Sequence, residues 1–188
     1  MKLALYAICK NEEHNVRDFL ACAIEADEIH VLDTGSTDGT LAAFDEYGAD
    51  LVTPISLYGA ELHPFRFDVA RNMVLEQIRK TDCDWAIFLD MDERLPAGWR
   101  EVFDRTVREE HTAAFLDMCL RDGEGQDSVA YRQLKAHRVN GYRWIYSAHE
   151  VLIAEIPVNT VNVDIRLEHL KDNSKPRSYL PLLADDLP

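Results

Sequence analysis

Apolar and polar positions alternate along the first half of the chain in a way that is typical of strands connected by helices. Short apolar runs predict buried strands, and apolar positions that recur every three or four residues predict amphipathic helices. The expected strands are residues 3–9, 28–33, 49–55 and 85–90, and the expected helices are residues 13–26, 38–47 and 67–80. Ser36 or Thr37 is the expected N-cap of the second helix, and Gly48 its C-cap. This alternation predicts an α/β fold with a mostly parallel sheet.

The pattern changes after Pro96. Residues 98–110 predict an amphipathic helix, and strand-like runs separated by glycine or proline follow at 113–120, 130–138, 151–156 and 161–169. We expect a mixed or antiparallel extension of the sheet that forms the second wall of a cleft. The chain is therefore expected to be one domain, 1–188, with halves at 1–95 and 96–188. Residues 179–188 begin a helical pattern that ends early, as in a piece cut from a longer protein.

Composition narrows the class of protein. A chain of 188 residues with 47% hydrophobic and 29% charged residues is typical of a soluble globular domain. The formal net charge of −14 argues against non-specific nucleic-acid binding and against anionic membranes. No apolar run is long enough to form a transmembrane segment. The four cysteines form no CxxC pair, which disfavours a zinc site or a disulfide framework, so a cytoplasmic location is expected.

One apolar run ends in two carboxylates, in the sequence Trp-Ala-Ile-Phe-Leu-Asp-Met-Asp at 85–92. Aspartate is unfavourable in strands and costly to bury, so Asp90 and Asp92 imply a compensating ligand. Mg²⁺ or Mn²⁺ fits best, because these cations prefer oxygen ligands and leave positions for substrate phosphates. The alternative is that the two aspartates start a turn and cap the helix that begins near Pro96.

Polar residues also follow the first two expected strands, as Lys-Asn-Glu at 10–12 and Asp-Thr-Gly-Ser at 33–36. Parallel strands bring their carboxyl ends to one edge of the sheet, which is where such sheets bind ligands. The three clusters are therefore expected to form one site.

Four segments, in this order and at suitable spacing, resemble the family 2 glycosyltransferases of the GT-A fold. They are residues 9–13, 31–40, 70–72 and 88–93, and Ala-His-Glu at 148–150 and Leu-Glu-His-Leu at 167–170 resemble motifs of one branch. Asp90-Met91-Asp92 corresponds to a DxD motif. The resemblance implies a GT-A type, Rossmann-like, mostly parallel sheet flanked by helices. It also implies a metal-dependent, inverting hexosyltransferase that uses a nucleoside diphosphate sugar, with a UDP-sugar favoured. Because the second half is compact, the resemblance does not identify the acceptor, which would be a saccharide, a lipid-linked molecule or a peptide.

The resemblance places the nucleotide site on the first half of the chain. Asp33 would accept hydrogen bonds from the base, Asn11 and Glu12 would line the same pocket, Arg71 would bind the diphosphate, and Asp90 would contact ribose or metal. Each assignment has a structural alternative. Asp33 would shape an ordinary turn, Asn11 and Glu12 would cap a helix, and Arg71 would form a surface salt bridge.

For the metal, the resemblance makes Asp92 the direct ligand, with Asp90 and His169 as further candidates. Imidazole is acceptable to Mn²⁺ and less suited to Mg²⁺. Without the resemblance, a lone histidine such as His169 is more often an ordinary core or surface residue.

Inverting transfer needs a base close to the acceptor hydroxyl. Glu150 directly precedes an apolar strand and is the expected base, and His149 is expected to orient it or to contact phosphate. A salt bridge from Glu150 to Arg138 or Arg143 is the alternative. A zinc protease motif H-E-x-x-H is excluded, because Ile153 stands where its second histidine belongs.

Three aromatic residues, Tyr142, Trp144 and Tyr146, alternate as strand residues do. They would stack on an acceptor or belong to the core, and we expect core positions for at least two of them.

Two other functions remain open. A sugar-phosphate nucleotidyltransferase would use a similar sheet, but it normally has a glycine-rich basic loop after its first strand, where this chain has Cys-Lys-Asn-Glu-Glu. A non-catalytic nucleotide-binding domain would keep the donor site without an active acceptor wall.

Overall fold

The computed structural model describes residues 1–121 and 127–170, and the structural statements below refer to these ranges. Within them, eight strands form one sheet in the order β3-β2-β1-β4-β7-β6-β10-β5, and β8 and β9 form a separate hairpin. The strands are β1 Leu3–Cys9, β2 Glu28–Asp33, β3 Ile55–Gly59, β4 Trp85–Phe88, β5 Glu93–Arg94, β6 Ala113–Arg121, β7 Asp127–Arg138, β8 Tyr142–Ile145, β9 Val151–Ala154 and β10 Thr160–His169. The helices are α1 Glu13–Ala23, α2 Thr40–Gly48, α3 Phe67–Ile78 and α4 Trp99–Thr106.

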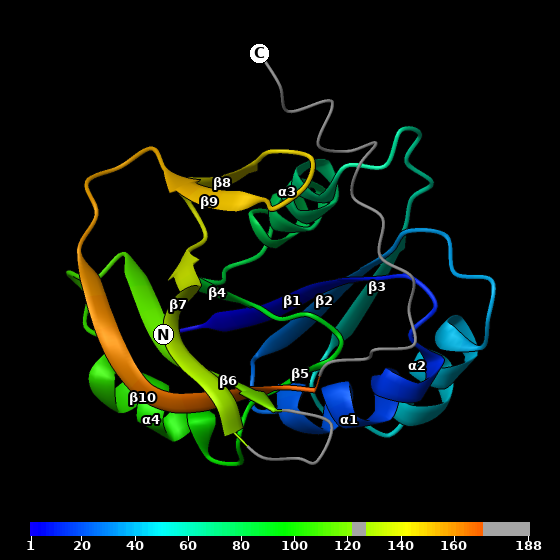
Figure 1. The fold of residues 1–188 in the computed structure, drawn as a ribbon, viewed down its shortest axis with the longest axis horizontal. Helices are drawn as coiled ribbons and strands as arrows, with labels where there is room; N and C mark the ends of the chain where they lie inside the picture. Colours follow the sequence, from blue (N-terminus) through cyan, green and yellow to red (C-terminus); the bar gives the residue numbers. More distant parts are fainter. Residues whose placement is uncertain (122–126, 171–188) are drawn as a thin grey trace.

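Strands β1 to β4 are parallel, and helices cover both faces of the sheet (Figure 1). Successive side chains of β1 point to opposite faces. Leu3, Leu5 and Ala7 pack in the core with α1, α2 and α4, whereas Ala4 and Tyr6 pack in the core with α3. Both faces of this strand are fully buried, which explains its almost continuous apolar sequence. The predicted α/β sheet is confirmed.

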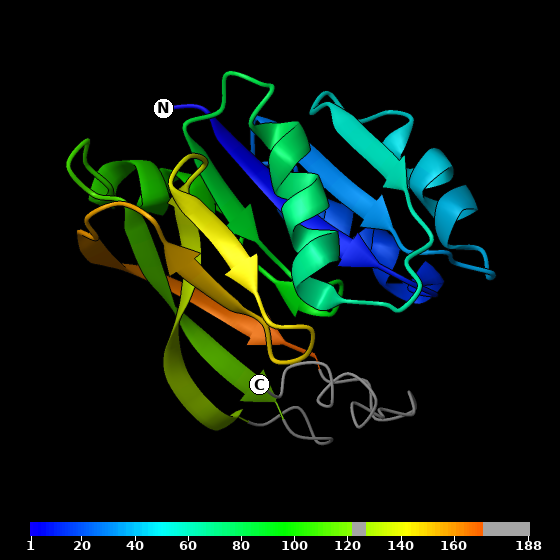
Figure 2. The same ribbon diagram turned by 90° about the horizontal axis from the view of Figure 1, so that it is seen from above.

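The second half adds a mixed extension to this sheet, as predicted. Strand β7 is antiparallel to β4 and β6, β10 is parallel to β6, and β5 is antiparallel to β10. Figure 2 shows that β6, β7 and β10 curve away from the parallel strands. The β8–β9 hairpin is attached to α3, because the Asn72 amide donates to the Trp144 carbonyl and accepts from the Trp144 N–H, both at 2.9 Å. The Trp144 ring thereby packs edge-on against Phe88, 4.6 Å between ring centroids.

Four strand predictions need correction. Strand β9 ends at Ala154 rather than 156, and β7 begins at Asp127 rather than 130. The third strand was expected at 49–55 and lies instead at Ile55–Gly59, because the chain turns after α2 through a hydrogen bond from Leu51 N–H to the Gly48 carbonyl. Pro54 lacks an N–H, and only the residues after it pair with β2. The apolar residues that suggested an earlier strand include Val52, whose side chain is 99% exposed. Strand β4 ends at Phe88, two residues before the predicted end.

The helix ends also differ from the predictions. The N-cap of α2 is Gly39 rather than Ser36 or Thr37, and Asp38 accepts the Thr40 N–H at 3.0 Å. Gly48 is the last residue of α2, and Ala49 is its C-cap. Helix α4 is shorter than the expected 98–110 because Gly98 has a φ of 80° and the C-cap Val107 is extended. The helix expected to begin near residue 179 lies outside the described residues.

Candidate active site

The loops that follow β1 and β2 are bound to each other. Asn11 has a left-handed backbone with a φ of 55°. Its N–H donates to Ser36 Oγ at 2.9 Å, and its Oδ1 accepts the Thr37 N–H at 2.8 Å. The Glu12 carboxylate accepts from the Asn15 amide at 2.8 Å, and Glu12 makes no side-chain cap hydrogen bond at the start of α1. The structure therefore brings Asn11 and Glu12 to the same edge of the sheet as the loop after β2, and the side chains do not cap α1.

Asp33 lies at the end of β2, and its carboxylate shapes the turn that follows. It accepts hydrogen bonds from the Gly35 and Ser36 N–H groups, both at 3.0 Å, from the Ser36 hydroxyl and from the Cys9 thiol. Gly35 has a φ of 94°, a conformation that favours glycine. A carboxylate offers about four acceptor positions. Four donors of the protein occupy these positions, so the alternative in which Asp33 shapes a turn holds. A nucleotide base could bind the carboxylate only by replacing one of these four donors.

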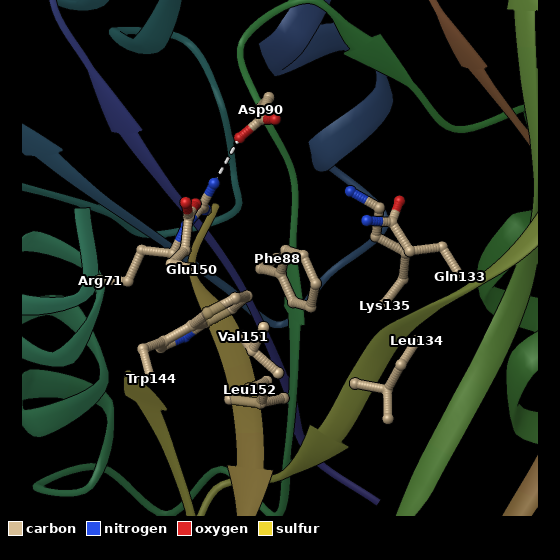
Figure 3. A pocket seen from close by; sticks show the side chains of 10 residues that line it. All are labelled: Arg71, Phe88, Asp90, Gln133, Leu134, Lys135, Trp144, Glu150, Val151 and Leu152. Carbon is tan, nitrogen blue, oxygen red and sulfur yellow. Dashed lines mark hydrogen bonds and ion pairs between the residues drawn. The ribbon is translucent and has the colours of Figure 1, made fainter. Parts of the chain in front are cut away.

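Arg71 on α3 connects the two halves of the site. Its Nη2 donates to Asp90 Oδ1 and its Nε donates to Glu150 Oε1, both at 2.7 Å (Figure 3). The guanidinium carbon lies 4.9 Å from the Trp144 ring centroid and 5.6 Å from that of Phe88. Burial disfavours the charge, but Asp90 and Glu150 outweigh burial and raise the Arg71 pKa. The alternative in which Arg71 forms a surface salt bridge is wrong, because only 4% of Arg71 is exposed.

Asp90 lies just beyond β4, at the carboxyl edge of the sheet. Burial opposes its ionisation, but the charges of Arg71, Lys135 and His169 outweigh burial and lower the pKa of Asp90 to about 2. Its backbone N–H donates to Glu93 Oε2 at 2.9 Å. Asp90 is therefore ionised at neutral pH and held in place by its own turn.

A buried ion pair between Lys135 and Glu93 supports this turn. Lys135 Nζ lies 2.7 Å from both Glu93 oxygens and 4.6 Å from the Phe88 ring centroid. The register of β7 shifts at Lys135, since Ala114 pairs with Ala136 and the next residue of β6 pairs with Leu134. Such bulges redirect side chains near functional sites. Burial and the nearby Asp90 charge raise the pKa of Glu93, against the effect of Lys135.

Asp92 and His169 form a carboxylate–imidazole pair at the same edge. His169 Nε2 lies 3.2 Å from Asp92 Oδ2, and this contact raises the pKa of His169. The pairing of β5 with β10 brings the two residues together, and the Leu170 N–H donates to the Asp92 carbonyl at 2.8 Å. Among the residues that the structure describes, no group of three or more His, Cys, Asp or Glu side chains forms a metal site. The residues here that could hold a cation are the carboxylate of Asp92 and the imidazole of His169.

Glu25, rather than Asp90 or Asp92, caps the start of α4. Both oxygens of the Glu25 carboxylate are used, one accepting the Gly98 N–H at 2.7 Å and the other the Arg100 N–H at 3.1 Å. The alternative in which Asp90 and Asp92 cap this helix is therefore wrong.

Glu150 lies between a turn and β9. His149 before it has a left-handed backbone with a φ of 53°. The two alternative partners of Glu150 are bonded elsewhere, since Arg138 donates to backbone carbonyls of 109 and 111 and Arg143 pairs with Glu155 at 2.7 Å. The partner of Glu150 is Arg71, 79 positions away in the sequence. The side chain of Glu150 remains 15% exposed.

A cavity of about 360 Å³ joins these groups. Arg71 and Glu150 lie on one side of it and Gln133 and Lys135 on the other, with Phe88 between them (Figure 3). The remaining lining residues are Asp90, Leu134, Trp144, Val151 and Leu152. Sequence analysis did not identify Gln133, Lys135 or Glu93. The sequence of β7 contains many polar residues, so nothing in it sets Gln133 and Lys135 apart.

Two of the three alternating aromatic residues belong to the core, as predicted. Tyr142 and Trp144 are 1% and 4% exposed, whereas Tyr146 is 48% exposed. Trp144 Nε1 donates to the Tyr6 hydroxyl at 2.9 Å, and this hydroxyl lies 2.9 Å from His137 Nε2. Trp144 therefore serves both the core and the cavity, and buried hydrogen bonds fix the orientation of its ring.

The chain matches the family model described as glycosyl transferase family 2 over residues 6–158. None of the curated proteins matches the chain. Among solved structures, S. aureus TarS 1–349 is 20% identical with a TM-score of 0.54, over 68% of this chain and 39% of that chain. The mannosyltransferase PcManGT from Pyrobaculum calidifontis, in complex with GDP-Man and Mn²⁺, is 20% identical with a TM-score of 0.50, over 64% of this chain and 36% of that chain.

The structural likeness confirms the expected GT-A fold, and the chain spans about two fifths of the length of these two structures. None of the helices in the described ranges has the length and apolar character needed to cross a membrane. The family model covers most of the chain, including the loops after β1 and β2, Arg71, both aspartates after β4, and Glu150. The chain therefore belongs to glycosyl transferase family 2.

Proposed function

We propose that this chain carries out inverting, metal-dependent transfer of a hexose-type sugar from a nucleoside diphosphate to an acceptor hydroxyl. The observation that carries the proposal is the double contact of Arg71. One nitrogen of its guanidinium holds Asp90 at the carboxyl end of β4, and another holds Glu150 on the wall of the same cavity. A carboxylate that can accept a proton is thereby fixed beside the sheet edge at which nucleotides bind in such folds.

The charge of the site supports a requirement for a metal ion. Two cations, Arg71 and Lys135, face four carboxylates, those of Asp90, Asp92, Glu93 and Glu150, so two negative charges remain uncompensated when His169 is neutral. A diphosphate would be repelled by this cluster unless a cation accompanied it. The proposed ligands are Asp92 and His169, with Asp90 next to them, and the oxygen–nitrogen donor set suits Mn²⁺. When bound, the metal would neutralise charge on the departing diphosphate.

The other roles belong to side chains of the chain itself. Glu150 accepts the proton of the acceptor hydroxyl while this oxygen attacks the anomeric carbon and the bond to the diphosphate breaks, without a covalent sugar intermediate. Arg71 positions Glu150, and His149 directs it into the cavity through its left-handed backbone. Asn11, Glu12 and the loop of Asp33 are proposed to bind the base and the ribose.

The comparisons support a nucleotide-sugar donor. TarS is similar in fold and has been solved in complex with UDP-GlcNAc, and PcManGT has been solved with GDP-Man and Mn²⁺. A UDP-sugar is therefore the first donor to test and a GDP-sugar the second.

The substitution Glu150→Gln tests this proposal. It keeps the shape of the side chain and removes its basicity, so sugar transfer or donor hydrolysis should fall by about 10²–10⁴-fold. Stabilisation by a nucleoside diphosphate with Mn²⁺, measured as a thermal shift, should remain, because binding does not need the base. The matched control is Glu155→Gln on the same hairpin, where the carboxylate pairs with Arg143 at the surface and activity should be unchanged.

Other outcomes would contradict the proposal. Full activity in Glu150→Gln would exclude this residue as the base. Release of pyrophosphate from a nucleoside triphosphate and a sugar phosphate would identify a nucleotidyltransferase instead. Metal-dependent nucleotide binding without transfer or hydrolysis of any donor would favour a non-catalytic nucleotide-binding domain.

A further inference from the structure

The cavity beside Glu150 has the size of a small-molecule site. Its volume of about 360 Å³ is at the low end of the usual range for ligand pockets, about 300–1,000 Å³. It is enclosed by α3, β4, β7 and the β8–β9 hairpin, with Glu150 on its wall (Figure 3). This size suits a single ring rather than several residues of a polymer.

Two residues that line the cavity each have a buried polar atom without a hydrogen-bond partner. These atoms are Arg71 Nη1, which is a donor, and Gln133 Oε1, which is an acceptor. Among the described residues only four buried side-chain atoms are left in this way, and two of them belong to residues that line this cavity. An unpaired buried polar group costs about 1–3 kcal/mol, so its retention calls for an explanation. A hydroxyl group both donates and accepts, so a ligand with several hydroxyls offers the partners that both atoms lack once their side chains turn towards the cavity.

Both cations of the cavity already have carboxylate partners. Lys135 contacts both oxygens of Glu93, and Arg71 contacts Asp90 and Glu150. An anionic ligand would therefore find no cation without a partner among these residues, and it would meet the carboxylates of Asp90 and Glu150. Burial of an unpaired charge is costly.

The rest of the wall is apolar. Phe88, Leu134, Trp144, Val151 and Leu152 line the cavity. Apolar and aromatic side chains with a few polar groups are typical of small-molecule sites, and they complement the C–H surface of a sugar ring. We propose that the cavity binds the acceptor as an uncharged, polyhydroxylated ring, a neutral sugar, rather than a sugar phosphate or an acidic sugar. This inference rests on the proposed function in that it takes Glu150 as the base that meets the acceptor hydroxyl.

Direct binding on the unmodified protein tests the preference for an uncharged ring. Methyl glycosides of glucose, galactose, mannose and N-acetylglucosamine are titrated against paired anionic probes, the hexose 6-phosphates and glucuronic acid, by ligand-observed NMR. At least one neutral glycoside should bind about tenfold or more tightly than its anionic counterpart, the effect of one unpaired buried contact. Equal or tighter binding of the anionic probes would overturn the inference.

The substitution Gln133→Leu tests whether the neutral glycoside binds in this cavity. It removes the unpaired acceptor and should weaken the neutral glycoside about 3- to 10-fold, as expected for one hydrogen bond. The control is Gln77→Leu on α3, whose amide oxygen accepts from Lys80 outside the cavity and whose loss should leave binding unchanged. Equal affinities of Gln133→Leu and Gln77→Leu for the neutral glycoside would overturn the assignment of the glycoside site to this cavity.

A nucleotide measurement on the same samples separates this inference from the proposed function. If a nucleoside diphosphate binds with Mn²⁺ and no neutral glycoside binds, the inference fails and the proposed function stands. If neutral glycosides bind in the cavity and no nucleotide binds under any metal condition, the proposed function fails and the assignment of the cavity to neutral sugars stands.

Discussion

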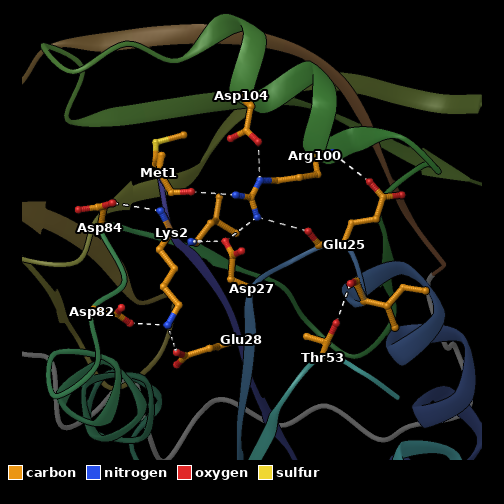
Figure 4. A network of polar contacts seen from close by, with 12 residues as sticks. Met1, Lys2, Glu25, Asp27, Glu28, Thr53, Asp82, Asp84, Arg100 and Asp104 are labelled. Carbon is orange, nitrogen blue, oxygen red and sulfur yellow. Dashed lines mark hydrogen bonds and ion pairs between the residues drawn. The ribbon is translucent and has the colours of Figure 1, made fainter. Parts of the chain in front are cut away.

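Both ends of the parallel sheet carry charged side chains, but among the described residues the ion pair with both members fully buried, Lys135 with Glu93, lies at the carboxyl end. At the amino-terminal ends of the strands, Lys2 and Arg100 join the starts of β1, β2, β4 and α4 (Figure 4). Lys2 bonds with Glu28 at 2.8 Å, and Arg100 bonds with Asp27 at 2.7 Å. The side chains of Lys2 and Asp27 are 37% and 36% exposed. Water can solvate these charges, so this network needs no ligand.

At the carboxyl ends, the side chains of Arg71, Lys135 and Glu93 are packed inside the protein and are 5%, 2% and 3% exposed. Asp90, the partner of Arg71, keeps 45% of its side chain exposed. Buried ion pairs often contribute little net stability, because desolvation opposes their attraction. The buried charges at the carboxyl end therefore call for an explanation in binding or catalysis rather than in stability.

The largest expected effect follows from breaking the buried pair. The substitution Lys135→Met leaves the Glu93 carboxylate buried without its cation, which should cost about 3–5 kcal/mol of the free energy of unfolding. Urea denaturation measures this loss. A loss of less than about 1 kcal/mol would contradict the contrast between the two ends of the sheet, because an exposed salt bridge contributes that much to stability.

A double variant serves as the control. Lys135→Met combined with Glu93→Leu removes both charges, and apolar replacement of a buried pair is often neutral or stabilising. Most of the lost stability should therefore return, except for the hydrogen bond that the Asp90 N–H donates to Glu93. Failure of the second substitution to restore stability would show that packing, rather than charge, explains the loss.

The next largest effect concerns pH. Burial lowers the pKa of His137 to about 4, with a contribution from the Arg79 charge and against the hydrogen bond to the Arg138 carbonyl. The folded protein therefore keeps this histidine neutral, whereas the unfolded chain binds a proton near pH 6.5. Stability is complete above pH 6.5 and falls as the pH drops towards 4, by about 3 kcal/mol in total.

The variant His137→Gln isolates this contribution. Its free energy of unfolding should fall less than that of the unmodified protein between pH 7 and pH 4.5, although it is lower at neutral pH because the bond to the Tyr6 hydroxyl changes. Urea denaturation at several pH values measures the difference in slope. If the free energy of unfolding depended on pH in the same way in both proteins, His137 would bind its proton in the folded protein as readily as in the unfolded chain.

Much of the fold could be predicted from periodicity alone. Strand β1 and the start of α3 lie exactly as expected, because buried parallel strands and amphipathic helices leave clear patterns in the sequence. The third strand was misplaced because Leu51 and Val52 are apolar although neither lies in a strand. Strand β5 has only two residues, and its pairing with β10 depends on the whole sheet. Such pairings leave no local pattern.

The candidate site was predicted as a set of residues but not as a network. The sequence identified Asp90, Asp92, Arg71, Glu150 and His169, and the structure brings them to one edge of the sheet. The sequence could not show which of these charged side chains pair, because the contacts join residues that lie 19, 77 and 79 positions apart. Pairing at such distances is set by the packing of whole elements, and no spacing rule encodes it.

The smallest expected effect comes from the exposed end. Asp104 pairs with Arg100 at an i,i+4 spacing on α4 with 46% of its side chain exposed. Asp104→Ala should cost about 0.3–0.5 kcal/mol at low salt. Asp104 also lies in the last turn of the helix, where a negative charge is unfavourable, so part of this loss is cancelled. Urea denaturation in 0.05 and 1 M NaCl measures the effect, which should shrink as salt screens the pair. A salt-insensitive loss above about 1 kcal/mol would mean that this end also depends on its charges for stability, and exposure to water would no longer distinguish the two ends.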